Sequence, residues 1–225
     1  MSDKALASVS GAVRKSPERE GLRADPNLSV PISKDEATLQ AQRNIDLLNL
    51  DDTIDTPRYE FMDALYKDVP PRAKLNLLKK AADRINAAAL PRSACRSGCS
   101  HCCNISAVIN QVDADAIGRA IGIKPKKLKS GRPGLSSRER WFGIPCTFLV
   151  KGRCSIYQDR PIACRMMFNM ADSPYFCDTR IPPDESHVTM LNLKQLEEGY
   201  VKTFIDYDWG DIRDFFPPKN PVSDR

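Results

Sequence analysis

Two groups of cysteines that lie well apart in the sequence constrain the fold more than any other feature of this chain. The first group comprises Cys95, Cys99, Cys102 and Cys103, and the second comprises Cys146, Cys154 and Cys164. A zinc ion or an iron–sulfur cluster needs about four soft ligands that point at one place. We therefore predict that the chain folds so that the two groups meet in a metal centre.

The redox compartment decides how the eight cysteines are interpreted. No stretch reaches the ~18–20 apolar residues that span a bilayer, and the N-terminal MSDKALASVSGAVRK lacks the apolar segment of a secretory signal. We expect a cytoplasmic protein with no membrane partner, in which thiols bind metal instead of forming disulfides. The adjacent pair Cys102 and Cys103 agrees with this, because a disulfide needs its two Cβ atoms to face each other.

The N-terminal part of the chain is predicted to be helical. Ser33 and Glu36 form a capping box that starts a helix running to about residue 50. A second helix is expected to run from 57 to 69, and a third from 72 to 90, where apolar residues recur at intervals of three and four. The fold class that follows is mainly α, with a helical N-terminal annex beside an irregular cysteine-rich core that has few short strands.

After the first cysteines, Asp113 is expected to cap a helix over 114–121 that Gly122 ends. From Asn192 onward, Leu193, Leu196, Tyr200 and Phe204 predict a last helix with one apolar face. We divide the chain into a disordered tail at 1–32, the annex at 33–90, the metal-binding core at 91–180, and the C-terminal helix and tail at 181–225.

A basic segment at 124–140 raises the question of nucleic-acid binding. Its positive residues are Lys124, Lys126, Lys127, Lys129, Arg132, Arg138 and Arg140. No interleaved aromatic residues or binding motif accompany this charge, so the pattern favours a solvated loop over a nucleic-acid contact. The net charge of +5 does not by itself indicate nucleic acid.

Metal ligands are predicted at the seven cysteines of the two groups, and Cys177 is an eighth candidate, with a buried structural thiol as its alternative. Their number allows two four-cysteine sites, or one iron–sulfur cluster with thiols to spare. Because four thiolates on zinc carry a net charge of about −2, burying them requires compensation. We expect Arg160 and Arg165, on either side of Cys164, to donate to the sulfurs, with surface arginines as the alternative. His101 is expected beside the ligands.

Two known arrangements of cysteines were compared with this one. The spacing of Cys95, Cys99 and Cys102 is that of the cluster-binding triad in radical S-adenosylmethionine enzymes, but no alternating strand–helix pattern follows it here. A nucleic-acid zinc ribbon needs two Cys-x2-Cys turns. Cys146, Cys154 and Cys164 of the second group are spaced too widely to form such a turn.

The cysteines and their neighbours resemble the YkgJ-type cysteine-cluster family, which is named for its CxxCxxCC signature. The residues that carry the resemblance are Cys95, Cys99, Cys102 and Cys103, then Cys146-Thr-Phe-Leu, Gly152-Arg-Cys154-Ser-Ile-Tyr157 and Arg160-Pro-Ile-Ala-Cys164-Arg165. The resemblance implies zinc or iron chelation within 95–165. Three residues separate Cys95 from Cys99, where the family name has two.

Three functions are compatible with these observations. The first is a metal-binding protein whose thiolates hold zinc, iron or an iron–sulfur cluster, in a structural, metal-handling or redox role. The second is a metal- or iron–sulfur-dependent protein-modifying enzyme, because the cluster also resembles part of flagellin lysine N-methylases. The third is a nucleic-acid-binding zinc module. The sequence identifies neither a catalytic residue nor a protein partner.

Overall fold

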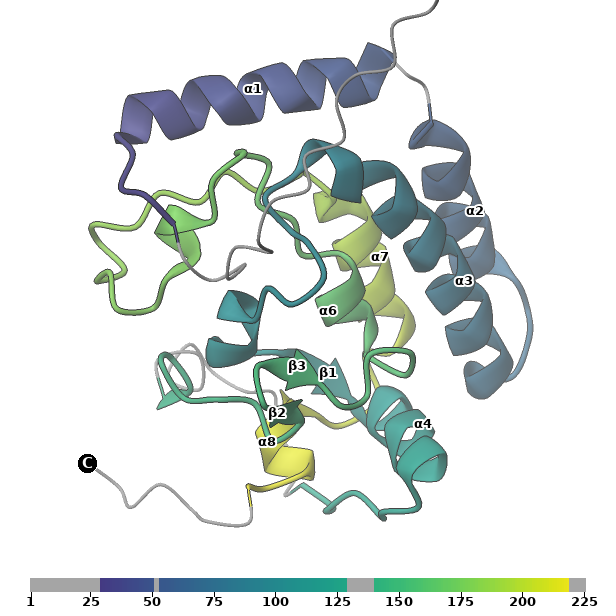
Figure 1. Ribbon diagram of the computed structural model, residues 1–225. Helices are drawn as coiled ribbons and strands as arrows, with labels where there is room; N and C mark the ends of the chain where they lie inside the picture. The colour runs from purple at the N-terminus through teal and green to yellow at the C-terminus, as the bar shows by residue number, and fades with distance from the viewer. Residues whose placement is uncertain (1–28, 51–52, 129–139, 219–225) are drawn as a thin grey trace, which may run out of the picture.

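A computed structural model describes residues 29–50, 53–128 and 140–218 of the chain (Figure 1). Helices dominate this part, and the strands form only two small two-stranded sheets within the described residues. The prediction of a mainly α fold with few short strands is therefore confirmed.

The annex consists of α1 (Lys34–Leu50), α2 (Asp55–Tyr66) and α3 (Pro71–Ala89). Figure 1 shows α1 running across the top of the molecule, while α2 and α3 lie side by side below it. The Ser33 hydroxyl accepts a hydrogen bond from the Glu36 N–H at 3.1 Å, as the predicted cap requires. The apolar face of α3 is buried against α2 and contributes Leu75, Leu78, Ala82 and Ile85 to the larger core.

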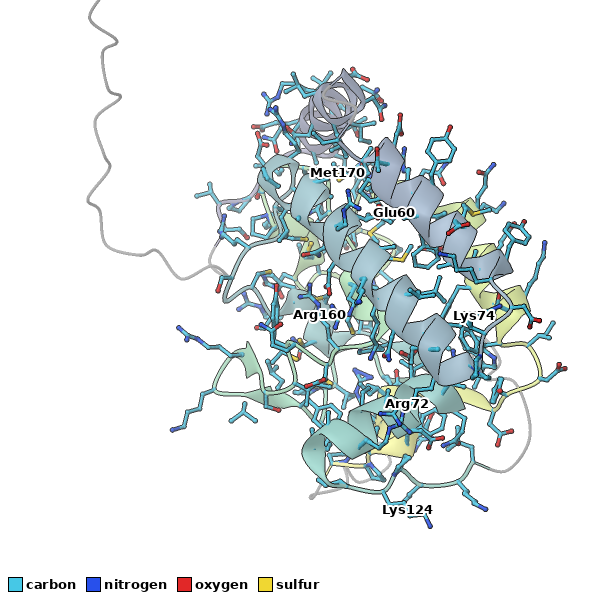
Figure 2. All side chains as sticks on the ribbon, turned by 90° about the vertical axis from the view of Figure 1, so that its right-hand side faces the viewer. Glu60, Arg72, Lys74, Lys124, Arg160 and Met170 are labelled. Atoms are coloured by element: carbon cyan, nitrogen blue, oxygen red, sulfur yellow. The ribbon has the colours of Figure 1, made fainter. Side chains whose placement is uncertain are left out.

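The end of α2 differs from the prediction. The helix was expected to reach residue 69, but it ends at Tyr66, and Lys67 is already extended with ψ 131°. A proline disfavours helical backbone at the residue before it, and the pair Pro70-Pro71 follows closely. The Lys74 ammonium, labelled in Figure 2, donates to the free carbonyl of Leu65 at 2.8 Å and so closes the junction of α2 with α3.

The start of α4 (Gln111–Ile121) also differs from the prediction. Its N-cap is Asn110, whose side-chain oxygen accepts from the Asp113 N–H at 3.0 Å, so Asp113 lies inside the first turn and is fully buried. An Asn side chain caps a helix as well as an Asp does. Gly122 ends the helix at φ +70°, in the left-handed conformation that glycine adopts without strain.

The two sheets join segments that are distant in the sequence. β1 (Val108–Asn110) pairs antiparallel with β4 (Trp209–Asp211), with Ile109 opposite Gly210. β2 (Leu149–Val150) and β3 (Arg153–Cys154) form a tight hairpin with both turn residues at positive φ. The β1–β4 pair brings the C-terminal part of the chain beside the first cysteine group.

The remaining elements are short, apart from α7 (Lys194–Thr203). They are η1 (Leu90–Arg92), η2 (His101–Asn104), α6 (Ile162–Arg165), η3 (Tyr175–Cys177) and α8 (Ile212–Phe215). The predicted apolar face of the last helix is confirmed, because Leu193, Leu196, Tyr200 and Phe204 are all buried. A second core, around Phe148, Ile156, Ile212 and Phe215, lies next to cysteines of the second group.

Most of the basic segment, 129–139, lies outside the described residues, as do most of the predicted tail and the chain end from 219. Lys124, labelled in Figure 2, is exposed, as are Lys126 and Lys127. Arg140 pairs with Asp214 at 3.7 Å and lies over the Trp141 ring. Within the described ranges, no helix has the length and apolar character needed to cross a membrane.

Candidate metal centre

A single cavity of about 260 Å³ collects the seven cysteines that were predicted as ligands. They reach it from four segments of the chain, and the lining sulfurs belong to Cys95, Cys99, Cys102, Cys103, Cys146, Cys154 and Cys164. All eight cysteines of the protein are free thiols. The two groups therefore meet in space, as the sequence analysis required.

Short turns, a hairpin and a one-turn helix position these side chains. Cys102 and Cys103 lie on the single turn η2, and Cys154 lies on the β2–β3 hairpin. The Cys146 N–H donates to the Cys103 carbonyl at 2.7 Å, which joins the two groups directly. Cys164 lies on α6, whose first turn follows Pro161.

Backbone N–H groups point at several of the sulfurs. The N–H two residues further along the chain donates to the sulfur of Cys99, Cys146 and Cys154. The Asn169 N–H donates to Cys95 in the same way. Such donors favour the thiolate over the thiol, because they stabilise negative charge on sulfur. Metal ligation by cysteine requires that thiolate form.

Burial acts in the opposite direction. It raises the pKa of the thiols of Cys95, Cys99, Cys146, Cys154 and Cys164, for Cys164 well above its usual value. Cys102 lines the cavity, and the pKa of its thiol rises first because it donates a hydrogen bond to Cys103 and then through burial. Metal binding at these thiols would release protons.

Arg160 places a positive charge among the sulfurs. Its guanidinium lies 4.0 Å above the Tyr157 ring and lines the same cavity (Arg160 is labelled in Figure 2). The charge opposes the rise in pKa at Cys102, Cys154 and Cys164. Its Nε is buried and has no hydrogen-bond partner in the described part of the chain. A thiolate nearby would satisfy this donor.

Arg165 has a different position from Arg160. Its Nε donates to the Arg160 carbonyl at 2.8 Å, and its guanidinium pairs with Asp83 of α3 and donates to the Gln158 carbonyl. Arg165 is buried, but it does not line the cysteine cavity. It anchors the loop that carries Arg160 and Cys164 to the annex.

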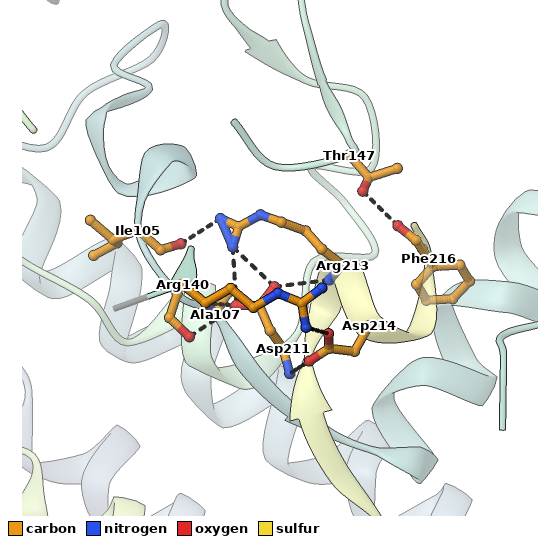
Figure 3. Close-up of polar contacts among 9 residues, drawn as sticks. Ile105, Ala107, Arg140, Thr147, Asp211, Arg213, Asp214 and Phe216 are labelled. Carbon is orange, nitrogen blue, oxygen red and sulfur yellow. Dashed lines mark hydrogen bonds and ion pairs between the residues drawn. The ribbon is translucent and has the colours of Figure 1, made fainter. Parts of the chain in front are cut away.

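A buried ion pair lies next to Ile105, Ala107 and Ile212, which line the cavity (Figure 3 shows the pair). Arg213 and Asp211 pair at 3.0 Å with both side chains fully buried, and Arg213 also donates to the Ile105 carbonyl at 2.7 Å. Asp211 accepts from the Ala107 N–H at 2.8 Å. The charge of Arg213 opposes the rise in the pKa of Cys146.

The remaining predicted residues lie at the edge of the site. Cys177 is outside the cavity lining, and its thiol accepts a hydrogen bond from the Asn169 side-chain amide at 3.2 Å. Burial raises the pKa of Cys177 to about 12. His101 is buried on η2 beside the ligand candidates. The pKa of Asp178 is lowered mainly by its hydrogen bond from Arg180, and His101 adds to this effect. His187, which has no cysteine neighbour in the sequence, shares a 2.7 Å hydrogen bond with the Thr38 hydroxyl.

The supporting roles of three residues were not predicted from the sequence. Asn169 contacts both Cys95 and Cys177, and no local pattern indicates this. Asp113 accepts from the Tyr200 hydroxyl and the Ile162 N–H, and so fixes the start of α6. Asp211 could have been found, because it and Asp214 form a capping box with the recognisable spacing of three.

The thiols share a cavity without being gathered at one point. Among the described residues, no group of three or more Cys, His, Asp or Glu side chains is arranged to hold an ion. Rotation about Cα–Cβ moves a sulfur among staggered positions without moving the backbone. The donor set is nevertheless all thiol, with aligned N–H donors and the buried Nε of Arg160, and this chemistry fits zinc or iron.

No curated protein and no solved structure shows a significant match to this chain. A family model matches residues 94–184, and its description reads "CxxCxxCC: Putative zinc- or iron-chelating domain". The matched segment contains every cysteine of the protein, including Cys177. The resemblance predicted from the sequence is confirmed: this segment is the part of the chain that matches the CxxCxxCC family of zinc- or iron-chelating domains.

Proposed function

We propose that the protein binds zinc or iron through its clustered cysteine thiolates, as an ion site or as an iron–sulfur centre, in a structural or redox role. The observation that carries this proposal is the shared cavity, which is lined by cysteines from both groups. The family match at 94–184 supports metal chelation. The free thiols fit a reducing compartment, and we propose the cytoplasm.

Metal analysis of protein purified without oxygen tests this function. We expect zinc or iron to copurify with the wild-type chain. Iron with sulfide and broad visible absorption would identify an iron–sulfur centre, whereas a colourless zinc protein would identify a tetrahedral site. A metal-free protein whose cysteines are oxidised to disulfides would refute metal binding.

The matched variants are Cys164→Ser and Ser97→Ala. Cys164 contributes a thiol to the cavity, whereas Ser97 lines the same cavity without one. Cys164→Ser should lower the metal content and the melting temperature, because metal-binding energy is folding energy in such sites. Ser97→Ala should match the wild type in both. Full metal content in Cys164→Ser would remove Cys164 from the proposed ligands.

A second candidate function is an enzyme that uses the centre to modify a protein lysine or to perform a redox step. The observation that favours it is a neighbouring cavity of about 670 Å³, which shares Ile105 and Met167 with the cysteine cavity. Its lining is mainly apolar, and Glu197 adds a carboxylate that suits a cationic substrate group. A pocket beside a metal centre is the usual arrangement of a catalytic site.

Cobalt substitution distinguishes the two candidates. A catalytic metal keeps one coordination position open, whereas a structural metal is closed by protein ligands. Azide added to the cobalt-loaded protein should change the visible spectrum if a position is open. An unchanged spectrum at high azide would refute the enzyme and leave the closed site.

A further inference from the structure

The cavity of about 670 Å³ beside the cysteine site differs from it in charge. Among the described side chains that line this second cavity, Glu197 is the only charged one. The cysteine cavity has the opposite lining, with three arginines and, in the ranges that the structure describes, no Asp or Glu. Ile105 and Met167 line both. The two cavities are therefore neighbours of opposite sign, and a cation is favoured in the second.

The Glu197 carboxylate is available to a ligand. Glu197 is exposed on α7, and within residues 29–50, 53–128 and 140–218 its side chain has no ion-pair or hydrogen-bond partner. The next residue, Glu198, pairs with Lys194 at 3.8 Å and does not line the cavity. The Ser106 hydroxyl, which does line it, already donates to Asp211 at 2.9 Å. A bound cation would therefore meet a carboxylate that loses no other partner.

Aromatic rings line the same cavity. Tyr200 and Trp209 are buried and meet edge to face with their ring centroids 5.8 Å apart, and Phe142 is half-buried. The Tyr200 hydroxyl accepts from the Asn110 side-chain amide at 2.7 Å, which fixes the position of the ring. Tyr200 follows Glu197 by three residues on α7, so the two side chains share one face of the helix. Because the face of an aromatic ring attracts cations, the rings add to the effect of the carboxylate.

The size of the cavity limits the kind of cation. Cavities of about 300–1,000 Å³ hold drug-sized ligands, and a single lysine side chain would fill only a small part of 670 Å³. Most of the remaining lining is apolar, and Met166, Met167 and Met190 contribute thioethers that adapt to irregular shapes. A ligand that fills the cavity therefore needs an apolar body as well as a cationic end.

We propose that this cavity binds a small organic amine, whose apolar body fills the cavity and whose ammonium group lies between Glu197 and the aromatic rings. None of the described cysteines lines the cavity, so the inference goes beyond the proposed metal binding. It gives a substrate class to the second candidate function.

Isothermal titration calorimetry of the full-length wild-type chain with octylammonium, 1-octanol and octanoate tests the proposal. The three probes share one apolar chain and differ in the charge of the head group. Octylammonium should bind ~3- to 10-fold more tightly than 1-octanol, as expected for one exposed ion pair and one cation–π contact, and octanoate should bind most weakly. Equal affinity for the amine and the alcohol, tighter binding of octanoate, or no binding of the amine would each overturn the proposal.

Two further measurements separate this inference from its neighbours. Nα-acetyl-lysine N-methylamide should bind more weakly than octylammonium, because it lacks the apolar body. Tighter binding of the lysine compound would replace the small amine with a protein lysine. Metal analysis of the same sample reports on the cysteine cavity, so the failure of amine binding and the failure of metal binding are distinguishable.

Glu197→Gln and Glu198→Gln are the matched pair of variants. Glu197→Gln should lower the affinity for octylammonium ~3- to 10-fold and leave the affinity for 1-octanol unchanged, which also reports that the cavity is intact. Glu198→Gln should match the wild type for both probes, because Glu198 does not line the cavity. Equal losses in the two variants would mean that general surface charge attracts the amine, and would refute the site.

Val201→Lys tests the position of the ammonium group. Val201 lines the cavity, is 42% exposed and follows Glu197 by four residues, so a lysine there can pair with the carboxylate. The preference for octylammonium over 1-octanol should disappear. Ile205→Lys is the control, because Ile205 is 41% exposed but does not line the cavity. Wild-type affinity for octylammonium in Val201→Lys would contradict the proposal.

Discussion

At the scale of single residues, the buried charged side chains Arg165, Asp211 and Arg213 support the cysteine loops. Arg165 joins the loop before α6 to Asp83 of α3, and Arg213 with Asp211 closes the opposite wall. In the fully buried pair of Arg213 and Asp211, removing one partner leaves an uncompensated charge and costs about 3–5 kcal/mol. The Asp83 side chain is half exposed, so the Arg165 pair contributes less. The positions of the cysteine thiols therefore depend on ion pairs in which no cysteine takes part.

Asp113 gives a prediction for pH dependence. Burial raises the pKa of its carboxyl above the usual range, although Lys79 and the Tyr200 hydroxyl act against the rise. The folded state thus holds this proton to a higher pH than the unfolded chain, whose Asp titrates near ~3.9. The stability contributed by Asp113 is present below that pH and is lost as the pH rises through the folded pKa.

Asp113→Asn should remove this loss, because asparagine keeps the shape and does not titrate. Its unfolding free energy should gain on the wild type as the pH rises from 4 to 7, by about 1.4 kcal/mol for each unit of pKa shift. Urea denaturation at several pH values measures the gain, with Asp115→Asn on the same helix as control. A constant deficit of Asp113→Asn across this range would mean that the ionised carboxylate is needed.

At the scale of elements, helix ends and turns were harder to predict than helices. The stripes of α3 and α7 were clear in the sequence, because a buried helical face repeats regularly. The early end of α2 and the Asn110 cap of α4 were not predicted, because several neighbouring residues in each sequence could begin or end the helix. Strand β4 and helix α8 carry no periodic pattern, because three- and four-residue elements are too short for one.

The candidate site was predicted only as a set of residue types. The cysteine spacing was sufficient to predict that the two groups meet, because a zinc or iron–sulfur centre needs about four thiolate ligands at one place. The contributions of Asn169 and Asp211 could not be seen, since each acts through a contact with a distant segment. The separate positions of Arg160 and Arg165 follow from side-chain direction, which neighbouring residues in a sequence do not reveal.

Gly118 gives a prediction at this scale. A Cβ there would lie 2.5 Å from the Ile123 carbonyl oxygen and 2.8 Å from the Pro125 ring. Gly118→Ala should therefore destabilise the fold by roughly 1–3 kcal/mol, the usual cost of overpacking, although alanine is normally the better helix former. Thermal and urea unfolding measure the change.

The comparison variant on the same helix is Ala120→Gly. Ala120 is exposed, so this change should cost up to about 1 kcal/mol through helix propensity alone. Glycine is thus expected to be the better residue at 118 and the worse one at 120. If Gly118→Ala stabilises the protein, the close approach of α4 to the following loop is not maintained in solution.

At the scale of the whole molecule, the cysteine core packs against both the helical annex and the C-terminal segment. The annex contacts it through α3 and α6, and the C-terminal segment contributes β4, α8 and the cavity-lining Ile212. Metal bound in the cavity would therefore link segments that span most of the described chain. Removing the metal should therefore lower the unfolding free energy of the whole protein, and not only the order of the cysteine loops.

Titration with metal tests this coupling. A ligand that binds only the folded state adds about 1.4 kcal/mol for each tenfold rise of its free concentration above Kd. The melting temperature of the metal-free, reduced protein should rise steadily with buffered free Zn²⁺ and fall again with a chelator. Mg²⁺ prefers oxygen ligands and should have no effect at the same concentrations. A melting temperature that is independent of zinc would contradict the coupling.

The pairing of β1 with β4 also sets an order of events during synthesis. Domains form from the N-terminus as the chain leaves the ribosome, and every cysteine precedes Trp209, where β4 begins. The thiols therefore emerge before the strand and the Asp211–Arg213 pair that complete their enclosure exist outside the ribosome. A nascent chain passes through a stage in which its sulfurs are open to metal donors and to oxidants alike, and that stage ends when β4 and α8 fold back onto the cysteine core.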